Sequence, residues 1–369
     1  MLDDQVPVET VGTVNPDLGI DFRDNVLAKI RAGQRKFYPE MADLSWYGSF
    51  LTHLQRTNGR KFKDQLAQVL AEHTRWITRD FDIKGAAGDP VLGKMAANMK
   101  TSGFVYLQFP DAVLSDLKQS LEASKYKNAV EGVLLSFDEV LSKGTRTGYS
   151  TASAAEHGDS NLLDFPAIAR IAQNPSVLRV LRDHLGALPM VGGFEITLNQ
   201  ANKTGDVPSG DWHADKGSIA FCKMFIYLND IDKARGPHGF VMGSHDLAAV
   251  EARLRADTSL TERAVVELLN MQRWPQELIH RYFPEEQKYH CGPAGLAILE
   301  DTRGFHRGSE LTNGYRWMIT IQWCLDPVTL AMPDRIDLKD VDPSLVPASE
   351  LERARFRHIF SRYLVPSHD

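Results

Sequence analysis

The feature that most constrains the fold is a succession of short strand-like segments between about residues 191 and 325. Four of them are rich in β-branched and aromatic residues, and Gly, Pro and Asp turns separate them: GGFEITLN, SIAFCKMFIYLN, GPAGLAILED and YRWMITIQWCL. Strands of this length with turn residues between them favour antiparallel sheets over alternating strand–helix units. The sequence therefore predicts a mixed α/β fold with a mainly β core, arranged as a double-sheet jelly roll or a related barrel.

Helical patterns surround and interrupt this core. In residues 1–100 the apolar positions recur at helical spacing, most clearly in FKDQLAQVLAEHTRWI. We expect this region to be mostly helical and to pack on the core. The core itself is assigned to 101–330, with a helical insertion near 246–283 around SLTERAVVELLNMQRW. The remaining 331–369 form a tail whose amphipathic segment ASELERARFRHIFSRYL predicts one helix packed on the outside of the core.

Composition narrows the classes of partner. The chain has 42 Lys and Arg against 48 Asp and Glu, a net charge of -6, and so lacks the basic surplus of a nucleic-acid-binding protein. It has neither an apolar run of the ~18 residues that a membrane span needs nor a basic, apolar leader at MLDDQVPVET. Its three cysteines are not in paired spacings, which indicates buried, reduced thiols and a cytoplasmic protein. These observations leave a small molecule or a protein as the substrate, and we expect a small molecule.

A candidate metal site lies in the strand-rich region. His213 and Asp215 are two residues apart, so on an extended chain both side chains point to the same face. His306 follows the apolar run GLAILED. Two imidazoles and one carboxylate on one face of an octahedron leave three positions open, two for a bidentate 2-oxo acid and one for O2. The His-x-Asp pair alone is weak evidence, because a turn histidine bonded to a neighbouring acid has the same pattern.

An arginine ten residues beyond His306 makes the combination more specific. Arg316 begins the strand YRWMITIQW, in which alternation places Arg316, Met318, Thr320 and Gln322 on one face. A guanidinium binds a carboxylate through two parallel hydrogen bonds, which a point charge cannot reproduce. We expect Arg316 to hold the distal carboxylate of a 2-oxo diacid. The alternative is a surface ion pair at a strand end.

The motifs in chain order are W-H-x-D, then ARGPHGFVMGSH, then GPAGLAILED, and then H-R-G-S followed by an arginine. Their order resembles that of the phytanoyl-CoA dioxygenase family. The likeness covers roughly 101–326. It implies a double-stranded β-helix, which is a jelly-roll variant, and an oxygenase that depends on iron(II), 2-oxoglutarate and O2. His213, Asp215 and His306 would then bind Fe2+, and Arg316 would bind 2-oxoglutarate. Two features depart from the family: its arginine is often eleven residues beyond the histidine, and the N-terminal helical region is additional.

Several further residues are weaker candidates. Lys223, on the strand AFCKMFIYL, could reach a co-substrate carboxylate, or its ammonium could extend to solvent. Asn199 at the end of FEITLN could bind 2-oxoglutarate or serve as a turn residue, and Ser309 could bind a co-substrate carboxylate. Asp301 is expected to be a turn residue or to support a metal ligand from behind.

The resemblance implies hydroxylation of a C–H bond, with release of succinate and CO2. Asp215 favours this outcome over halogenation, because its carboxylate occupies the position that halogenating relatives leave for chloride. Two alternatives remain at this stage. One is a cupin-like enzyme that uses another divalent metal for a different reaction, and the other is a jelly-roll binding protein without catalysis.

Overall fold

The structure, a computed structural model, describes residues 60–122, 126–128, 134–143, 150–155, 161–201, 211–215, 218–271, 273–325 and 335–365. Most of the predicted N-terminal helical region, residues 1–59, lies outside these ranges. Within them, the helix expected in FKDQLAQVLAEHTRWI is α3 (Arg60–Thr78), followed by α4 (Pro90–Ser102). The Asp89 side chain caps α4, accepting hydrogen bonds from two backbone amides of its first turn.

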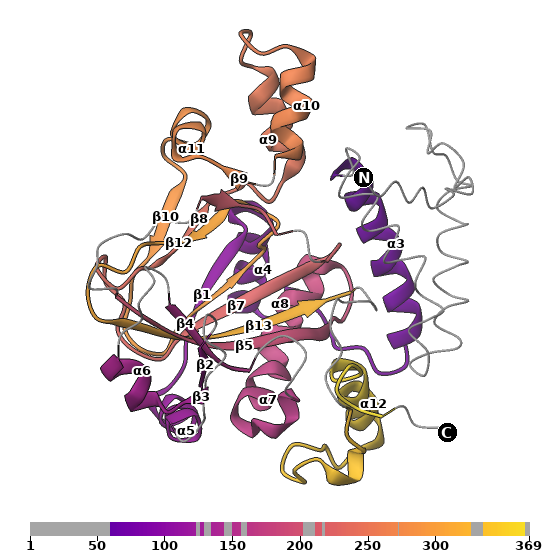
Figure 1. The fold of residues 1–369 in the computed structure, drawn as a ribbon. Coiled ribbons are helices and arrows are strands. Elements are labelled where there is room, and N and C mark those ends of the chain that lie inside the picture. The colour runs from indigo at the N-terminus through magenta and orange to yellow at the C-terminus, as the bar shows by residue number, and fades with distance from the viewer. Residues whose placement is uncertain are drawn as a thin grey trace, which may run out of the picture.

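Two antiparallel sheets form the core (Figure 1). The larger has the order β1 (Phe104–Gln108), β11 (Leu296–Glu300), β7 (Phe221–Tyr227), β13 (Tyr315–Cys324), β5 (Met190–Gln200), β4 (Ser150–Ala155), β2 (Tyr126–Asn128) and β3 (Leu134–Leu135). The smaller has the order β10 (Gln287–His290), β8 (His238–Val241), β12 (His306–Gly308), β6 (Trp212–His213) and β9 (Arg273–Trp274). The four strands predicted from sequence are β5, β7, β11 and β13, and they are neighbours in the larger sheet. This arrangement confirms the predicted jelly-roll class.

Both faces of the larger sheet are buried, each by a different partner. On β13, Trp317, Ile319 and Trp323 belong to one large apolar cluster with residues of α4, α7 (Pro166–Ala172) and α8 (Pro175–Leu185). The Trp323 indole donates to the carbonyl of Ala172 at 3.0 Å. Alternate residues such as Met318 belong to a smaller cluster, which includes side chains of β7 and β8. The helices therefore cover the outer face, and the inner face looks toward the smaller sheet.

Three helices lie between β8 and β10: α9 (Leu247–Arg255), α10 (Glu262–Asn270) and α11 (Gln276–Tyr282). Figure 1 shows α9 and α10 projecting from the end of the sandwich. They share an apolar cluster with β6, β9 and Phe305, in which Trp274 packs 4.5 Å from the Phe305 ring. The Gln276 side chain accepts from Trp212 at 2.8 Å and from Arg307 at 2.9 Å. The insertion is thus bonded directly to the strands that carry the histidines of the candidate site.

The remaining helices flank the larger sheet. They are α5 (Asp111–Glu122), α6 (Phe137–Lys143) and, near the C-terminus, α12 (Glu350–Ile359). The predicted C-terminal helix is correct in place but shorter than expected. Leu351 in the first turn of α12 is 51% exposed, while Phe356 and Ile359 are buried. Beyond the helix, Leu364 pairs in parallel with Ile336, which closes the tail onto itself.

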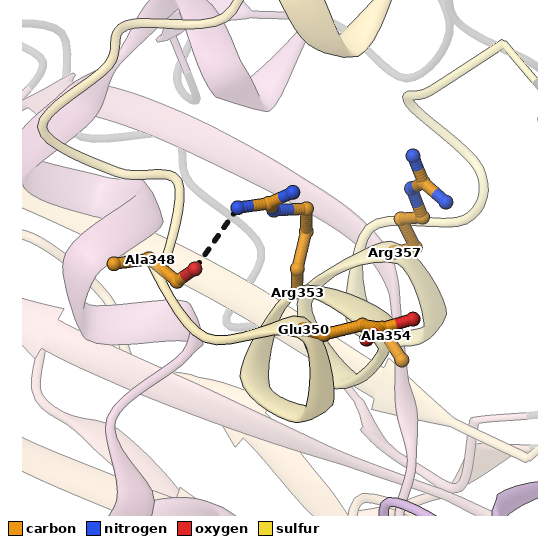
Figure 2. A pocket seen from close by; sticks show the side chains of 5 residues that line it. All are labelled: Ala348, Glu350, Arg353, Ala354 and Arg357. Carbon is orange, nitrogen blue, oxygen red and sulfur yellow. Dashed lines mark hydrogen bonds between the residues drawn. The ribbon is translucent and has the colours of Figure 1, made fainter.

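A shallow hollow with a volume of about 330 Å³ lies along α12 (Figure 2), lined by Ala348, Glu350, Arg353, Ala354 and Arg357. Arg353 donates to the Ala348 carbonyl at 3.0 Å. The lining holds a single acid and neither histidine nor cysteine, so this hollow offers no set of metal ligands.

The structure tests two expectations from composition, the burial of the cysteines and the lack of a membrane-spanning segment. Cys222 and Cys324 are buried, whereas Cys291 is exposed, contrary to the expectation that all three are buried; all three are free thiols. No helix in the described part of the chain is both long and apolar enough to cross a bilayer.

The packing of Trp274 gives the first prediction. Its side chain is fully buried and packs on the ring of Phe305, just before β12, so Trp274→Ala removes a large aromatic and leaves a cavity. We expect the free energy of unfolding in urea to fall by about 3–5 kcal/mol. Val91→Ala, at a site 69% exposed on α4, serves as the control and should change it by no more than about 0.5 kcal/mol. An equal loss in both variants would contradict this account of the insertion.

Candidate metal centre

Strand pairing brings the two candidate histidines together. In the smaller sheet His306 on β12 lies directly opposite His213 on β6, and their ring centroids are 4.3 Å apart. Asp215 follows β6 and is fixed by its backbone amide, which donates to the Thr302 carbonyl at 2.9 Å. One ligand atom from each of His213, Asp215 and His306 lies within 4.8 Å of the others. The structure therefore unites the predicted triad.

Both histidines are oriented by the backbone just before them. Nδ1 of His213 is 3.1 Å from the Asp211 carbonyl, and Nδ1 of His306 is 3.0 Å from the Gly304 carbonyl. A carbonyl oxygen can only accept, so each Nδ1 carries the proton and each Nε2 keeps its lone pair for a metal. Burial lowers the pKa of His213 and lowers that of His306 to about 4, so both rings are neutral near pH 7.

Asp215 supplies the negative charge of the group. Burial acts to raise its pKa, but His306 and Lys223 more than offset that effect and hold the pKa well below its usual range. Nζ of Lys223 is 2.7 Å from Oδ2 of Asp215, and Nε2 of His306 is 3.5 Å from the same oxygen. Two neutral imidazoles and one carboxylate make a donor set that suits a divalent cation such as Fe2+. A cation bound there would compete with the Lys223 ammonium for Asp215.

The turn between β11 and β12 supports two of the three residues, Asp215 and His306. Its carbonyls at Thr302 and Gly304 bond Asp215 and His306, as described above. The turn is held in place by the fully buried Asp301. Arg303 contacts both carboxylate oxygens, at 2.8 and 2.6 Å, and Nε2 of His184 on α8 lies 2.8 Å from one of them. Asp301 therefore fixes the turn to a helix on the other side of the larger sheet.

A second group of potential ligand atoms occurs in this clamp, namely His184, Cys222 and Asp301. Its chemistry does not suit a metal. Both oxygens of Asp301 are already engaged by the guanidinium of Arg303, and burial raises the pKa of the Cys222 thiol well above its usual value. A protonated thiol is a poor ligand, and Arg303 would repel a cation. We interpret this group as structural.

The candidate co-substrate residues fall on the inner face of the larger sheet or beside it. Arg316 is 3% exposed and lies directly opposite Asn199, which is 4% exposed, across β13 and β5. Nη1 of Arg316 donates to the Gly236 carbonyl. A side chain at Gly236 would come within 2.7 Å of the Ser309 carbonyl oxygen, so Ser309 is near this end as well. The Ser309 hydroxyl is buried without a partner in the described part of the chain.

Lys223 lies at the other end of this face. It is paired in register with Gln322, six positions beyond Arg316 on the same strand, which separates the two backbones by roughly 20 Å. The two cations therefore cannot clamp the same carboxylate. Any contact between Lys223 and 2-oxoglutarate would be at the end that chelates the metal.

Sequence reasoning missed a set of buried polar residues beside the triad. His238 on β8 and Glu300 on β11 are 3.0 Å apart, and His238 lies 5.6 Å from His306 between ring centroids. The sequence around each of these two residues did contain a signal. Glu300 is a charged residue that ends the apolar run GLAIL, and His238 stands within the motif ARGPHGFVMGSH.

Neither a family model nor a curated protein matches the sequence. Among solved structures it is similar to SnoN, a non-heme alpha ketoglutarate dependent epimerase from nogalamycin biosynthesis, at 16% identity and a TM-score of 0.41 over 63% of this chain and 82% of that one. HygX from Streptomyces hygroscopicus with nickel and 2-oxoglutarate bound is 15% identical. Its TM-score is 0.40, and the match covers 69% of this chain and 94% of HygX. EctD from S. alaskensis with bound Fe is 16% identical. Its TM-score is 0.39, and the match covers 63% of this chain and 75% of EctD.

The Asp301 clamp gives the second prediction. Asp301→Asn removes the charge that holds the turn, so the carbonyls that orient His306 and Asp215 are less well placed. We expect the Kd for Mn2+, measured by calorimetry well below the unfolding temperature, to rise by about 10- to 100-fold. Asp82→Asn is the matched control, because it breaks another ion pair to α8, the 2.8 Å contact with Arg182. If both variants bind Mn2+ like the wild type, the clamp does not position the site.

Lys223 gives the third prediction. Because its ammonium competes with a metal for Asp215, Lys223→Met should tighten Mn2+ binding, by about 2- to 10-fold for a partly screened ion pair. Calorimetric titration with Mn2+ checks this, with Lys288→Met on an exposed position of β10 as the control. Weaker binding in Lys223→Met would mean that the ammonium holds Asp215 in its ligating orientation instead.

Proposed function

We propose that this protein is a non-haem iron(II)- and 2-oxoglutarate-dependent dioxygenase that hydroxylates a C–H bond of a small-molecule substrate, with release of succinate and CO2. The observation that carries the proposal is the convergence of two imidazoles in a fixed tautomer with one ionised carboxylate. These groups stand at the inner face of a jelly roll on which Arg316 is also buried.

In this proposal His213, Asp215 and His306 would hold Fe2+, which would then be able to bind 2-oxoglutarate and O2. Bound iron with these co-substrates supplies the oxidising chemistry, whereas the protein supplies position and exclusion of water. The backbone carbonyls of Asp211 and Gly304 keep both Nε2 atoms available as ligands. Asp215 brings one negative charge, so the site with a divalent ion has a net charge of about +1, which favours an anionic co-substrate.

Arg316 suits the distal carboxylate of 2-oxoglutarate. A guanidinium that is 3% exposed has lost most of its hydration, and a carboxylate in bidentate contact would compensate for that loss. Its bond to the Gly236 carbonyl orients one Nη without cancelling the charge. The Ser309 hydroxyl and the Asn199 amide stand near it as further hydrogen-bonding groups. These roles for Arg316, Asn199 and Ser309 are part of the proposal.

The fourth prediction tests the iron ligands and the co-substrate arginine together. Metal-free protein should bind Fe2+ without O2 and, after addition of 2-oxoglutarate, develop a weak visible charge-transfer band. His213→Ala and His306→Ala should abolish the band. Arg316→Met should keep the metal but raise the Kd for 2-oxoglutarate by roughly 10- to over 100-fold, because it removes charge-assisted hydrogen bonds.

The control for Arg316 is Arg235→Met, which removes a partly exposed arginine that pairs with Asp232. The outcomes also separate the alternative functions. Metal binding without any effect of 2-oxoglutarate would favour a cupin-like enzyme of another reaction class. Absence of metal binding in the wild type would favour a jelly-roll binding protein. Consumption of O2 that requires both Fe2+ and 2-oxoglutarate is expected only of the proposed dioxygenase.

A further inference from the structure

A chain of buried polar side chains crosses the space between the two sheets. It begins at Tyr106 on β1, which is 48% exposed and whose hydroxyl is 2.7 Å from Nδ1 of His290 on β10. Nε2 of His290 is 3.7 Å from Glu300 on β11. The other oxygen of Glu300 is 3.0 Å from Nε2 of His238 on β8. The chain thus runs from the surface to the neighbourhood of the triad.

Burying these polar groups lowers the free energy of unfolding. Glu300 and His290 are fully buried, and His238 is 5% exposed. Buried ionisable groups cost several kcal/mol in lost hydration, and apolar side chains of similar volume at such sites often stabilise a protein more. The chain does, however, fix the direction of the His238 imidazole. Phe225 stacks on that ring at 4.1 Å, and Glu300 holds one of its two nitrogens.

His238 stands between the triad and Arg316. Its ring centroid is 5.6 Å from that of His306. Its backbone amide donates to the Tyr227 hydroxyl at 2.9 Å, and Tyr227 is paired in register with Met318, two residues beyond Arg316 on β13. Arg316 bonds the carbonyl of Gly236, two residues before His238. A diacid that reaches from the metal ligands to Arg316 must pass this imidazole.

We propose, resting on the function proposed above, that His238 donates a hydrogen bond from Nδ1 to the distal carboxylate of 2-oxoglutarate beside Arg316, and that Glu300 is the residue that positions it. Nε2 is occupied by Glu300, whereas Nδ1 has no hydrogen-bond partner among the described residues. Because a carboxylate oxygen only accepts, Nδ1 carries the proton and Nε2 accepts from the carboxyl group of Glu300. Burial raises the pKa of Glu300, which favours the protonated form that this arrangement requires.

The test compares two ligands of the metal-loaded protein. Calorimetry with Mn2+-loaded protein gives the Kd for 2-oxoglutarate and for oxalate, which chelates a metal but has no distal carboxylate. His238→Phe keeps an aromatic ring to stack on Phe225 and removes both nitrogens. We expect it to weaken 2-oxoglutarate by at least tenfold and oxalate by less than twofold. His245→Gln is the matched control, since the ring of His245 bonds the Lys100 carbonyl instead, and it should alter neither Kd.

Variants of Glu300 test the positioning role. Glu300→Leu leaves Nε2 without a partner and should weaken 2-oxoglutarate as His238→Phe does. Glu300→Gln can still donate to Nε2 and should restore binding to within about threefold of the wild type. Equal weakening of oxalate and 2-oxoglutarate in His238→Phe would overturn the inference, as would unchanged binding of both. If the wild type itself binds Mn2+ but not 2-oxoglutarate, the proposed function fails instead.

Discussion

The pairing of β12 with β6 is the constraint on which the site depends. It sets His306 opposite His213 in a sheet of short strands, where a slip of one residue in either strand would turn the imidazole of that strand to the other face. The register is secured from two sides. The 301–304 turn bonds Asp215 and His306 through its own carbonyls, and the insertion bonds Trp212 and Arg307 through Gln276. A divalent-ion site of this kind requires ligands fixed to a fraction of an ångström, and these contacts provide that support.

Stability and function are divided between the two faces of the larger sheet. The outer face buries Trp317, Ile319 and Trp323 against helices and forms the largest apolar cluster of the described residues. The inner face carries Glu300 and Arg316, which are buried at a cost in hydration. The outer core offsets this cost. The strands of a jelly roll can therefore hold charged groups in their interior because the same strands are packed from behind.

The helical insertion connects two projecting helices to the strands that carry the candidate site. Its helices α9 and α10 project from the sandwich, yet Gln276 of α11 bonds Trp212 and Arg307 on the strands that carry His213 and His306. A change in the insertion can thus affect the region around the site without replacing any residue of the triad. In a fold that hosts many reactions, such attached segments are where specificity is set.

The sequence by itself determined the class of fold and the face on which Arg316 lies, and it predicted which three residues form the candidate triad. Period-two alternation along YRWMITIQW is a local property of the strand, and the two-residue spacing of His213 and Asp215 is a local property of the chain, although Asp215 itself lies just beyond β6. Only the tertiary structure decided that Lys223 pairs with Asp215, that Asp301 reaches His184 at a separation of 117 residues, and that His238 meets Glu300. These contacts join side chains of different elements: two strands, the two sheets, or a turn and α8. The periodicity of one segment does not encode how that segment packs against another. The physical reason is that alternation fixes the face of a side chain, whereas its partner is fixed by the order and register of the strands and by how the layers pack.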